Sequence, residues 1–338
     1  MVNRINADEF NYSIYILINN CYHFQVLTHL NNTVNDMERI RIKYMSDLIF
    51  EWSEGVKNRE DIIDYCVDYK SAVGKWANSI MSEVHFWEYE SLTEGHRCFG
   101  EALHRNAREV FDCNRISIFP GCRVLDIGCG CLYKWGNILQ DGEYIPMDPL
   151  AHFYNHLYKK WKHSNDMRKD TVFGLFEFAS LFVDEKMDYV IIDNAIDHCI
   201  DPLKAILEAL KVLKVEGTLS LYTYEDESIN AMGSGLHNWN LALNHSNDLI
   251  VYNIDNYVNV SKYLSEYIDF EISEDAIKYS PAVGEHRTFA VNMKKKKEVP
   301  EDILGDGTAN NLALMISALM RLMASKEYYD DLGKVMEF

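Results

Sequence analysis

The segment RVLDIGCGCL, at residues 123–132, has the pattern of a buried strand that ends in a glycine turn. Aliphatic residues surround one carboxylate, Asp126, and two glycines follow with Cys129 between them. Glycines permit dihedral angles that a side chain resists, and they let a ligand approach the backbone. The segment therefore suggests a nucleotide-binding turn, a metal or redox site built on Cys129 and Cys131, or only a tight corner.

The sequence around this segment alternates between short apolar runs and helical patterns, which predicts a parallel sheet with right-handed crossovers. The expected strands are 123–127, 143–147, 171–176, 188–195 and 218–224. The clearest helix between them is 202–214. After the fifth strand we expect a long loop, a helix at 255–268, and strands at 270–280 and 287–296.

Helical patterns flank this α/β region on both sides. Residues 1–112 are rich in aliphatic and aromatic residues, and a helix face is formed by Val73, Trp76, Ala77, Ile80, Val84 and Trp87. We interpret this region as a lid, a substrate-binding region or an oligomerisation region. Residues 298–338 are expected to form a linker and a C-terminal helix near 308–326. The apolar stripe of that helix predicts either an intramolecular core or a homodimer: Leu312, Met315, Leu319, Leu322 and Met323.

Composition excludes several classes of function. The net charge is −19, with 52 acidic residues against 33 basic ones, so the chain lacks the basic footprint that a duplex-binding protein needs. Eight cysteines in 338 residues do not make a disulfide scaffold. The apolar runs are too short to span a bilayer, and the first residues do not have the pattern of a signal peptide. We therefore expect a cytoplasmic protein with no nucleic-acid partner and no membrane partner.

Three features of the glycine turn distinguish between cofactors. Asp126 precedes the glycines, and a carboxylate there suits a cationic ligand better than a pyrophosphate. The dinucleotide fingerprint requires a third glycine, but that position holds Tyr133, which disfavours a nicotinamide-dependent oxidoreductase. Asp148 ends the next strand, 20 residues beyond Gly128, where a carboxylate can accept both hydroxyl hydrogens of a ribose.

Four motifs in order resemble the class I S-adenosylmethionine-dependent methyltransferases: VLDIGCG, YIPMD, DYVIIDNAIDHCIDP and ILEALKVLKVEGTLSLYTY. The resemblance implies a Rossmann-like α/β fold with sheet order 3-2-1-4-5-7-6, strand 7 being antiparallel. Residues 113–297 would form the methyltransferase domain. The implied cofactor is S-adenosylmethionine, and the product is S-adenosylhomocysteine.

The resemblance also implies the residues that bind the cofactor. The glycine turn would line the methionine and ribose side, with Cys129 as a small apolar residue of the turn rather than a redox or metal ligand. Asp148 would hold the ribose, and the residues after the third and fourth strands would contact the adenine and lie beneath the sulfonium. The set is Asp126, Gly128, Cys129, Gly130, Asp148, Pro149, Leu150, Glu177, Phe178, Asn194 and Ala195.

Candidate catalytic residues follow the fourth and fifth strands. His237 is the favoured general base, because a neutral imidazole accepts a proton near physiological pH; the alternative is a packing histidine. His198 is either a second base candidate or a buttress of the cofactor loop. The expected substrate-binding residues are Trp239, Glu225 and Asp197. Asp193 and Asp197 could bind Mg²⁺, but no third ligand is evident in the sequence, so no metal is predicted.

The sequence thus predicts an enzyme that methylates a small molecule, with oxygen as the favoured acceptor atom. Nitrogen or a peptide group is the alternative acceptor. A non-catalytic subunit that binds S-adenosylmethionine and acts through a partner is the non-enzymatic alternative. The acceptor is set by loops and lid side chains whose arrangement the sequence does not give.

Overall fold

The architecture was examined in a computed structural model. The structure describes residues 36–93, 119–130, 139, 141–161, 169–184, 186–231, 233–280, 284–300, 303, 308–325 and 328. Residues 1–35 of the predicted helical region, and Cys131, lie outside the described residues.

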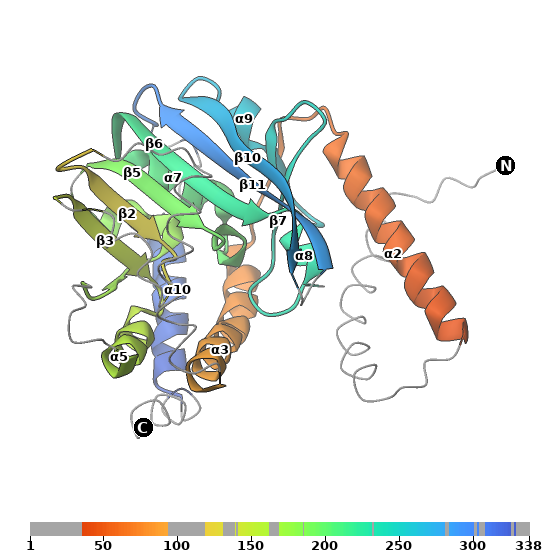
Figure 1. The fold of residues 1–338 in the computed structure, drawn as a ribbon, viewed down its shortest axis with the longest axis horizontal. Coiled ribbons are helices and arrows are strands. Elements are labelled where there is room, and N and C mark those ends of the chain that lie inside the picture. Colours follow the sequence, from red (N-terminus) through yellow and green to blue (C-terminus); the bar gives the residue numbers. More distant parts are fainter. Residues whose placement is uncertain are drawn as a thin grey trace.

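A seven-stranded sheet forms the centre of the chain (Figure 1), with the order β10-β11-β6-β5-β2-β3-β4. The strands are β2 (Arg123–Ile127), β3 (Glu143–Asp148), β4 (Val172–Phe173), β5 (Met187–Asp193), β6 (Leu213–Tyr224), β10 (Ile268–Ser280) and β11 (Gly284–Lys295). β2 to β6 pair in parallel, while β11 is antiparallel to both β6 and β10. This is the order 3-2-1-4-5-7-6 with an antiparallel seventh strand, so the predicted fold class is confirmed.

The core of the sheet follows from its apolar strands. Val124 and Leu125 of β2 pair with Tyr189 and Val190 of β5, and the inner positions of both strands are nearly inaccessible. Helix α7 (Pro202–Val212) covers this core with ten buried residues. Its start is defined by Pro202 in the first turn and by the Asp201 side chain, which accepts a hydrogen bond from the backbone N–H of Lys204.

A second, four-stranded antiparallel sheet was not predicted. Its order is β1-β9-β8-β7, from β1 (Ile63–Asp64), β9 (Tyr257–Asn259), β8 (Leu249–Tyr252) and β7 (Asn240–Leu243). The expected loop at 225–248 contains α8 (Glu227–Asn230) and β7, and the expected helix at 255–268 contains β9 and only a short helix, α9 (Val260–Tyr263). Tertiary packing explains the error, because β7, β8 and β9 are buried at every position and share one apolar core with β6, β11 and α7.

Three helices pack together beside the carboxyl edge of the sheet: α3 (Tyr69–Thr93), α5 (Ala151–Trp161) and α10 (Thr308–Met323) (Figure 1). Met315, Leu319 and Leu322 of α10 share a core with Trp76, Ile80 and other residues of α3. The predicted stripe of the C-terminal helix is therefore covered within the chain, and the homodimer stays a prediction. Two short helices, η1 (Phe176–Phe178) and α6 (Ala179–Phe182), follow β4, and η2 (Ile196–His198) follows β5.

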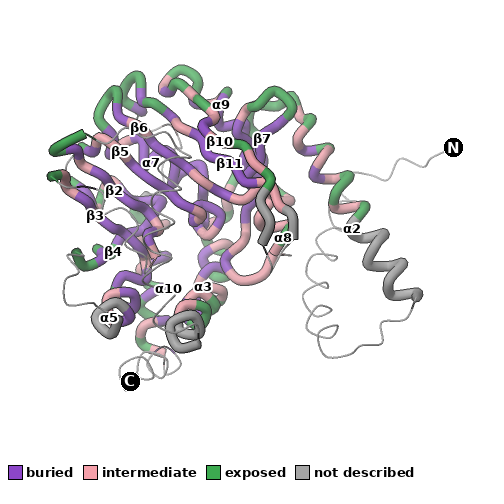
Figure 2. The backbone as a smooth tube through the Cα atoms, in the orientation of Figure 1, coloured by how far each residue is buried: buried purple, intermediate pink, exposed green. Residues whose placement is uncertain are grey.

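Helix α2 (Asp36–Lys57) extends away from the main body (Figure 1), and its C-terminal turns contact the second sheet. Trp52 and Val56 pack against Ile250, Tyr252 and Tyr257. In Figure 2, the residues of this helix whose burial is described, 47–57, are mostly exposed or intermediate, in contrast to the buried strands of the large sheet. Among the described residues, no helix has the length and hydropathy needed to cross a membrane.

Candidate functional site

The glycine turn after β2 lies at the carboxyl edge of the sheet, where the strand order reverses between β2 and β5. Gly128 and Gly130 have φ values of +73° and +59°, a region that side chains resist. A Cβ on Gly128 would come within 2.4 Å of the Phe176 ring and 2.6 Å of the Ala195 Cβ. A Cβ on Gly130 would meet only the Trp87 ring, at 3.7 Å. Gly128 therefore serves close packing, whereas Gly130 leaves space beside the backbone.

Asp148 ends β3 directly beside this turn. Its carboxylate accepts hydrogen bonds from the backbone N–H of Gly130, at 3.2 Å, and of Leu150, at 2.8 Å. The side chain is buried, and burial raises the pKa of Asp148 to about 7, helped by the charges of Glu83 and Asp126 and opposed by the two backbone hydrogen bonds. The structure thus holds a carboxylate of tunable charge at the position predicted to bind a ribose.

The other predicted residues of this part of the site are buried to different extents. Asp126 is 2% exposed, and the Tyr144 hydroxyl donates a hydrogen bond to its carboxylate. Cys129 is buried, with its Sγ 3.8 Å from the Thr171 hydroxyl. Leu150 belongs to the core between α3, α5 and α10, and Pro149 is half-buried. Asp126 therefore already has a partner within the chain.

Glu177 and Phe178 lie on η1, inside the molecule. The Glu177 carboxylate accepts hydrogen bonds from the backbone N–H groups of Ile200, at 2.6 Å, and Asp201, at 3.3 Å, so it fixes the start of α7. Phe178 is 1% exposed, and the Lys204 ammonium lies 4.7 Å from its ring centroid. Both side chains have internal partners, and their predicted contact with an adenine stays a prediction.

The turn after β5 carries Asn194 and Ala195. Asn194 adopts a left-handed conformation with φ of +51°, and its N–H donates to the Tyr222 carbonyl at 2.8 Å. The Asn194 Oδ1 is buried and has no hydrogen-bond partner among the described residues. A buried oxygen without a partner is costly, which points to a ligand atom at this position.

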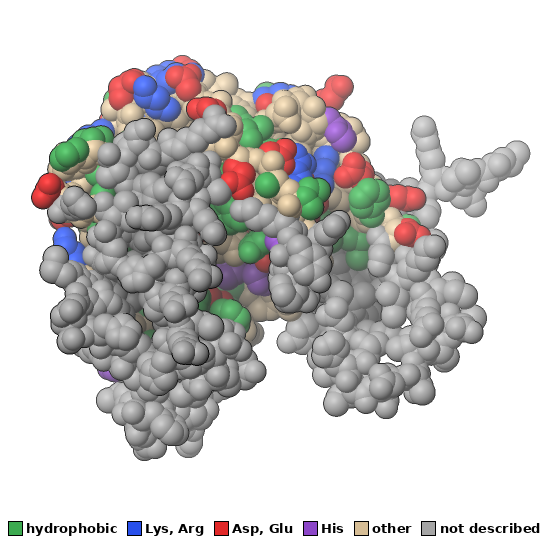
Figure 3. All heavy atoms as spheres, in the orientation of Figure 1, with side chains coloured by type: hydrophobic (Ala, Val, Ile, Leu, Met, Phe, Trp, Pro, Cys, Tyr) green, Lys and Arg blue, Asp and Glu red, His purple; other side chains and the backbone are tan. Residues whose placement is uncertain are grey.

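A histidine cluster, formed by Asp197, His198 and His237, follows β5. Asp197 and His198 lie on η2, and His237 comes from the loop before β7. The His237 Nδ1 lies 2.6 Å from the Asp197 Oδ2 and 3.3 Å from the His198 Nε2. The His198 Nε2 lies 3.7 Å from the same carboxylate oxygen. In Figure 3, histidine side chains are visible in a recess near the centre of the surface.

The pKa values of His237 and Asp197 are shifted in opposite directions. Burial alone would lower the pKa of His237, but the hydrogen bond and charge of Asp197, with smaller contributions from Glu227 and Glu83, raise it above its usual value. Burial alone would raise the pKa of Asp197, but the neighbouring histidines lower it. Asp197 is therefore a buried carboxylate held ionised by His198 and His237.

Two acidic residues that the sequence did not single out face the cluster. The Glu227 Oε1 lies 3.8 Å from the His237 Nδ1, and burial together with the Asp197 charge raises the pKa of Glu227 to about 7. Glu83, on α3, accepts a hydrogen bond from the Trp87 Nε1 at 2.9 Å. The apolar face predicted on α3 includes Trp87, but nothing in the sequence placed this helix beside Asp148.

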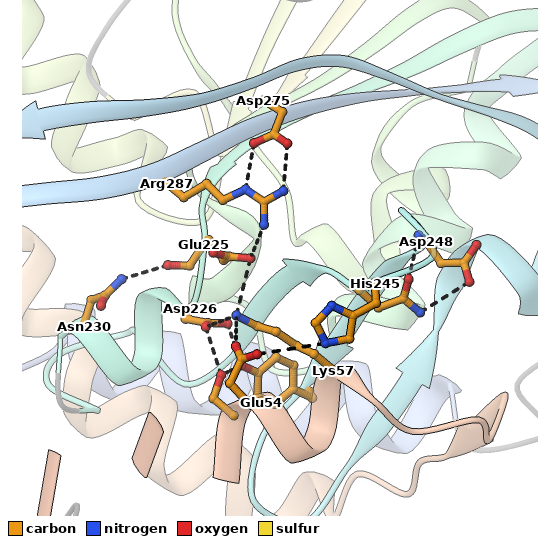
Figure 4. Close-up of polar contacts among 12 residues, drawn as sticks. Glu54, Lys57, Glu225, Asp226, Asn230, His245, Asp248, Asp275 and Arg287 are labelled. Carbon is orange, nitrogen blue, oxygen red and sulfur yellow. Dashed lines mark hydrogen bonds and ion pairs between the residues drawn. The ribbon is translucent and has the colours of Figure 1, made fainter. Parts of the chain in front are cut away.

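Trp239 and Glu225 are not part of the histidine cluster, and neither side chain is exposed at the surface. Trp239 is 3% exposed and stacks on Tyr65 with ring centroids 5.4 Å apart. Glu225 pairs with Lys57 at 3.5 Å and with Arg287 at 3.0 Å (Figure 4). Their predicted roles in substrate binding stay predictions, and both have structural partners.

One group among the described residues has metal-ligand geometry, and it is the histidine cluster. The sequence offered Asp193 and Asp197 as a possible Mg²⁺ pair without a third ligand, but in the structure Asp197 lies with His198 and His237, and Asp193 is not in this group. Folding brings His237 back to Asp197, since the loop before β7 crosses the carboxyl ends of β5 and β6. The 40 residues between Asp197 and His237 hid this proximity in the sequence.

Comparison with known proteins gave matches to methyltransferases. No family model matches the chain. Cycloartenol-C-24-methyltransferase 1 of Oryza sativa subsp. japonica is 27% identical over 168 residues, which is 46% of this chain and 47% of that protein. The match thus spans about half of the curated relative.

Among solved structures, the N-methyltransferase NodS of Bradyrhizobium japonicum WM9 in complex with S-adenosylhomocysteine has a TM-score of 0.42 and 12% identity, over 64% of this chain and 99% of that chain. The plantazolicin methyltransferase BamL, in complex with a triazolic desmethylPZN analog and S-adenosylhomocysteine, has a TM-score of 0.42 and 13% identity, over 68% and 98%. The fold assignment comes from the strand order itself.

Proposed function

We propose that this chain, whose sheet has the class I methyltransferase strand order, transfers a methyl group from S-adenosylmethionine to an oxygen of a small molecule. The observation that carries the proposal is the hydrogen bond between the Gly130 N–H and the Asp148 carboxylate. It joins the glycine turn after β2 to the carboxylate that ends β3, at the switch point where ligands bind in open α/β sheets.

The residues present fit the cofactor. Asp148 offers acceptor oxygens for the ribose hydroxyls, and the space beside Gly130 admits a ligand against the backbone. Asn194 provides a buried oxygen that lacks a partner within the described chain. When bound, S-adenosylmethionine supplies an activated methyl group: a carbon–oxygen bond forms as the carbon–sulfur bond breaks, and the electron pair goes to sulfur.

His237 is the proposed general base for the acceptor hydroxyl. Its Nδ1 donates a hydrogen bond to the Asp197 carboxylate, which leaves Nε2 free to accept the proton. Asp197 also stabilises the imidazolium that forms, because its buried charge is held 2.6 Å from the ring. His198 limits the orientation of the ring, with ring centroids 4.7 Å apart.

Calorimetric titration of the full chain with S-adenosylmethionine, S-adenosylhomocysteine and NADH tests the proposal. We expect binding of the first two and none of NADH, and at least 10-fold weaker binding by Asp148→Asn. Asp269→Asn is the matched control, because Asp269 is 70% exposed and pairs only with Lys296 among the charged groups described. Folded protein that ignores S-adenosylmethionine, or that binds NADH, would overturn the proposal.

A further inference from the structure

We propose that the histidine cluster is a binding site for a divalent transition-metal ion, with the Asp197 Oδ2, the His198 Nε2 and the His237 Nδ1 as protein ligands. Binding of the ion depends only on these side chains. The catalytic role given to the ion below rests on the proposed methyltransferase function.

The geometry of the three atoms carries the inference. They are separated by 2.6, 3.3 and 3.7 Å. A point in their plane lies about 1.9 Å from all three, and a small displacement out of the plane gives the roughly 2.0–2.2 Å of zinc bonds to nitrogen and carboxylate oxygen. The three atoms thus converge on one point.

A single hydrogen on the His237 Nδ1 cannot serve both of its neighbours. If the His237 Nδ1 carries a hydrogen, it donates to Asp197 at 2.6 Å and cannot also accept from the His198 Nε2 at 3.3 Å. If it carries none, it faces the Asp197 carboxylate with two lone pairs opposed. A cation at the common point interacts favourably with all three atoms at once.

The ligand set indicates the class of metal. Two imidazoles and one carboxylate suit zinc, iron or manganese, whereas calcium and magnesium prefer oxygen ligands alone. Asp197 has a side chain 1% exposed, and the histidines are 19% and 27% exposed. The carboxylate is therefore fixed in the interior, while the imidazoles border an accessible side from which an acceptor could reach the ion.

Two further observations favour a cation at this place. Glu227, at 3.8 Å from the His237 Nδ1, places a second carboxyl group next to the cluster. The Asn194 Oδ1 and the Asp197 Oδ1 are both buried without a hydrogen-bond partner among the described residues. Both belong to the short turn after β5, so this turn offers more oxygen atoms than the folded chain uses.

The ion would change how the acceptor is activated. With His237 coordinated through Nδ1, an acceptor hydroxyl bound to the ion becomes more acidic and releases its proton to water. In the metal-free protein the same task falls to the His237 Nε2. Methyl transfer would therefore be faster with the ion, and removal of the ion would reduce the rate without affecting binding of S-adenosylmethionine.

The test uses the full chain after dialysis against EDTA, titrated with Zn²⁺ and with Mn²⁺ by calorimetry. One ion should bind per chain, and His198→Ala and His237→Ala should each weaken binding at least 100-fold. Co²⁺ should give visible absorption bands that both variants lose. His245→Ala is the matched control, because His245 is 61% exposed and meets only Glu54, at 4.0 Å, among its described charged neighbours.

The outcomes separate the two proposals. Wild-type protein that binds S-adenosylmethionine but no metal refutes the metal site, and metal binding that survives in both variants refutes its location. Metal binding without binding of S-adenosylmethionine refutes the proposed function and leaves the site standing. Circular dichroism checks that each variant is folded, and His198→Gln replaces any alanine variant that is not.

Discussion

Two polar clusters follow neighbouring strands of the sheet, and they differ in how completely their charges are balanced. After β6, Lys57 lies 2.9 Å from Asp226 and 3.5 Å from Glu225, and Arg287 joins Glu225 to Asp275 (Figure 4). We call this set the charge network. After β5, the histidine cluster has one buried carboxylate oxygen with no partner among the described residues, and the His237 Nδ1 lies within hydrogen-bonding distance of both the Asp197 carboxylate and the His198 Nε2.

This difference separates a cluster that stabilises the fold from a cluster that is suited to binding or reaction. In the charge network, two cations from α2 and β11 pair with three carboxylates from the turn after β6 and from β10, and Asp226 also accepts hydrogen bonds from Ser53 and Tyr252. Its charged groups thus pair with one another and hold these elements together. The histidine cluster is under-satisfied, and such clusters are typical of sites that bind or react. A change in the histidine cluster should therefore affect turnover, and a change in the charge network should affect stability.

The largest effect is expected from His237→Gln. Loss of a general base or metal ligand should lower kcat by about 10² to 10³, with the affinity for S-adenosylmethionine nearly unchanged. Turnover is measured as S-adenosylhomocysteine formed with an acceptor found by screening. His245→Gln should retain full activity. Equal activity of the two variants would place the chemistry elsewhere.

Next in size is Lys57→Met, which leaves Asp226 without its cation and Glu225 with only Arg287. The Lys57 side chain is only 11% exposed, so we expect the free energy of unfolding to fall by about 2 to 4 kcal/mol. Urea unfolding measures it. The double variant Lys57→Met/Asp226→Asn should recover part of the loss, and kcat should change less than twofold. A large loss of kcat in the folded variant would contradict the division of roles.

The sequence predicted the cofactor end of the site better than it predicted the histidine cluster. The sequence signals strand β2, its glycines and Asp148 locally, because a buried strand and the glycine turn after it are formed by consecutive residues. The sheet order was predicted from the resemblance that these motifs support. The convergence of His237 on Asp197 was not predictable, since the two residues are 40 positions apart and the chain passes through α7 and β6 between them. The second sheet was missed for the same reason: apolar residues in β7 to β9 fit either a helix or a strand until their partners are known.

A smaller effect is expected from the titration of Asp148, which tests the cofactor end of the site. The pKa of Asp148 is raised to about 7, so the carboxyl is mostly protonated at pH 6 and mostly ionised at pH 8. An ionised carboxylate accepts both ribose hydroxyl hydrogens, whereas the protonated form keeps a hydrogen of its own. The affinity for S-adenosylmethionine should therefore rise about 10-fold between pH 6 and 8. Calorimetry at several pH values measures this, and Asp148→Asn should remove the slope.

The raised pKa of Asp148 also makes the free energy of unfolding depend on pH, and this dependence runs opposite to that of the affinity for S-adenosylmethionine. In the unfolded chain the carboxyl ionises near pH 4, so between pH 4 and 7 the folded state binds the extra proton. The contribution of Asp148 to stability is complete below pH 4 and is lost as the pH rises through 7. If the affinity for S-adenosylmethionine increases with pH while the contribution of Asp148 to stability decreases, one carboxyl governs both properties. If the affinity and the stability change with pH in the same direction, this conclusion is wrong.

The smallest effect is expected from Asp275→Asn, at the exposed end of the charge network. Asp275 makes two hydrogen bonds of 2.7 Å to Arg287, but its side chain is 42% exposed. Solvent screening limits such a pair to about 0.5 kcal/mol, and the loss should vanish in high salt. Arg287 still pairs with Glu225 in this variant, so the network stays closed where it is buried. A loss above about 2 kcal/mol, or any loss of turnover, would mean that the exposed end of the network also supports the site, and the contrast between the two clusters would fail.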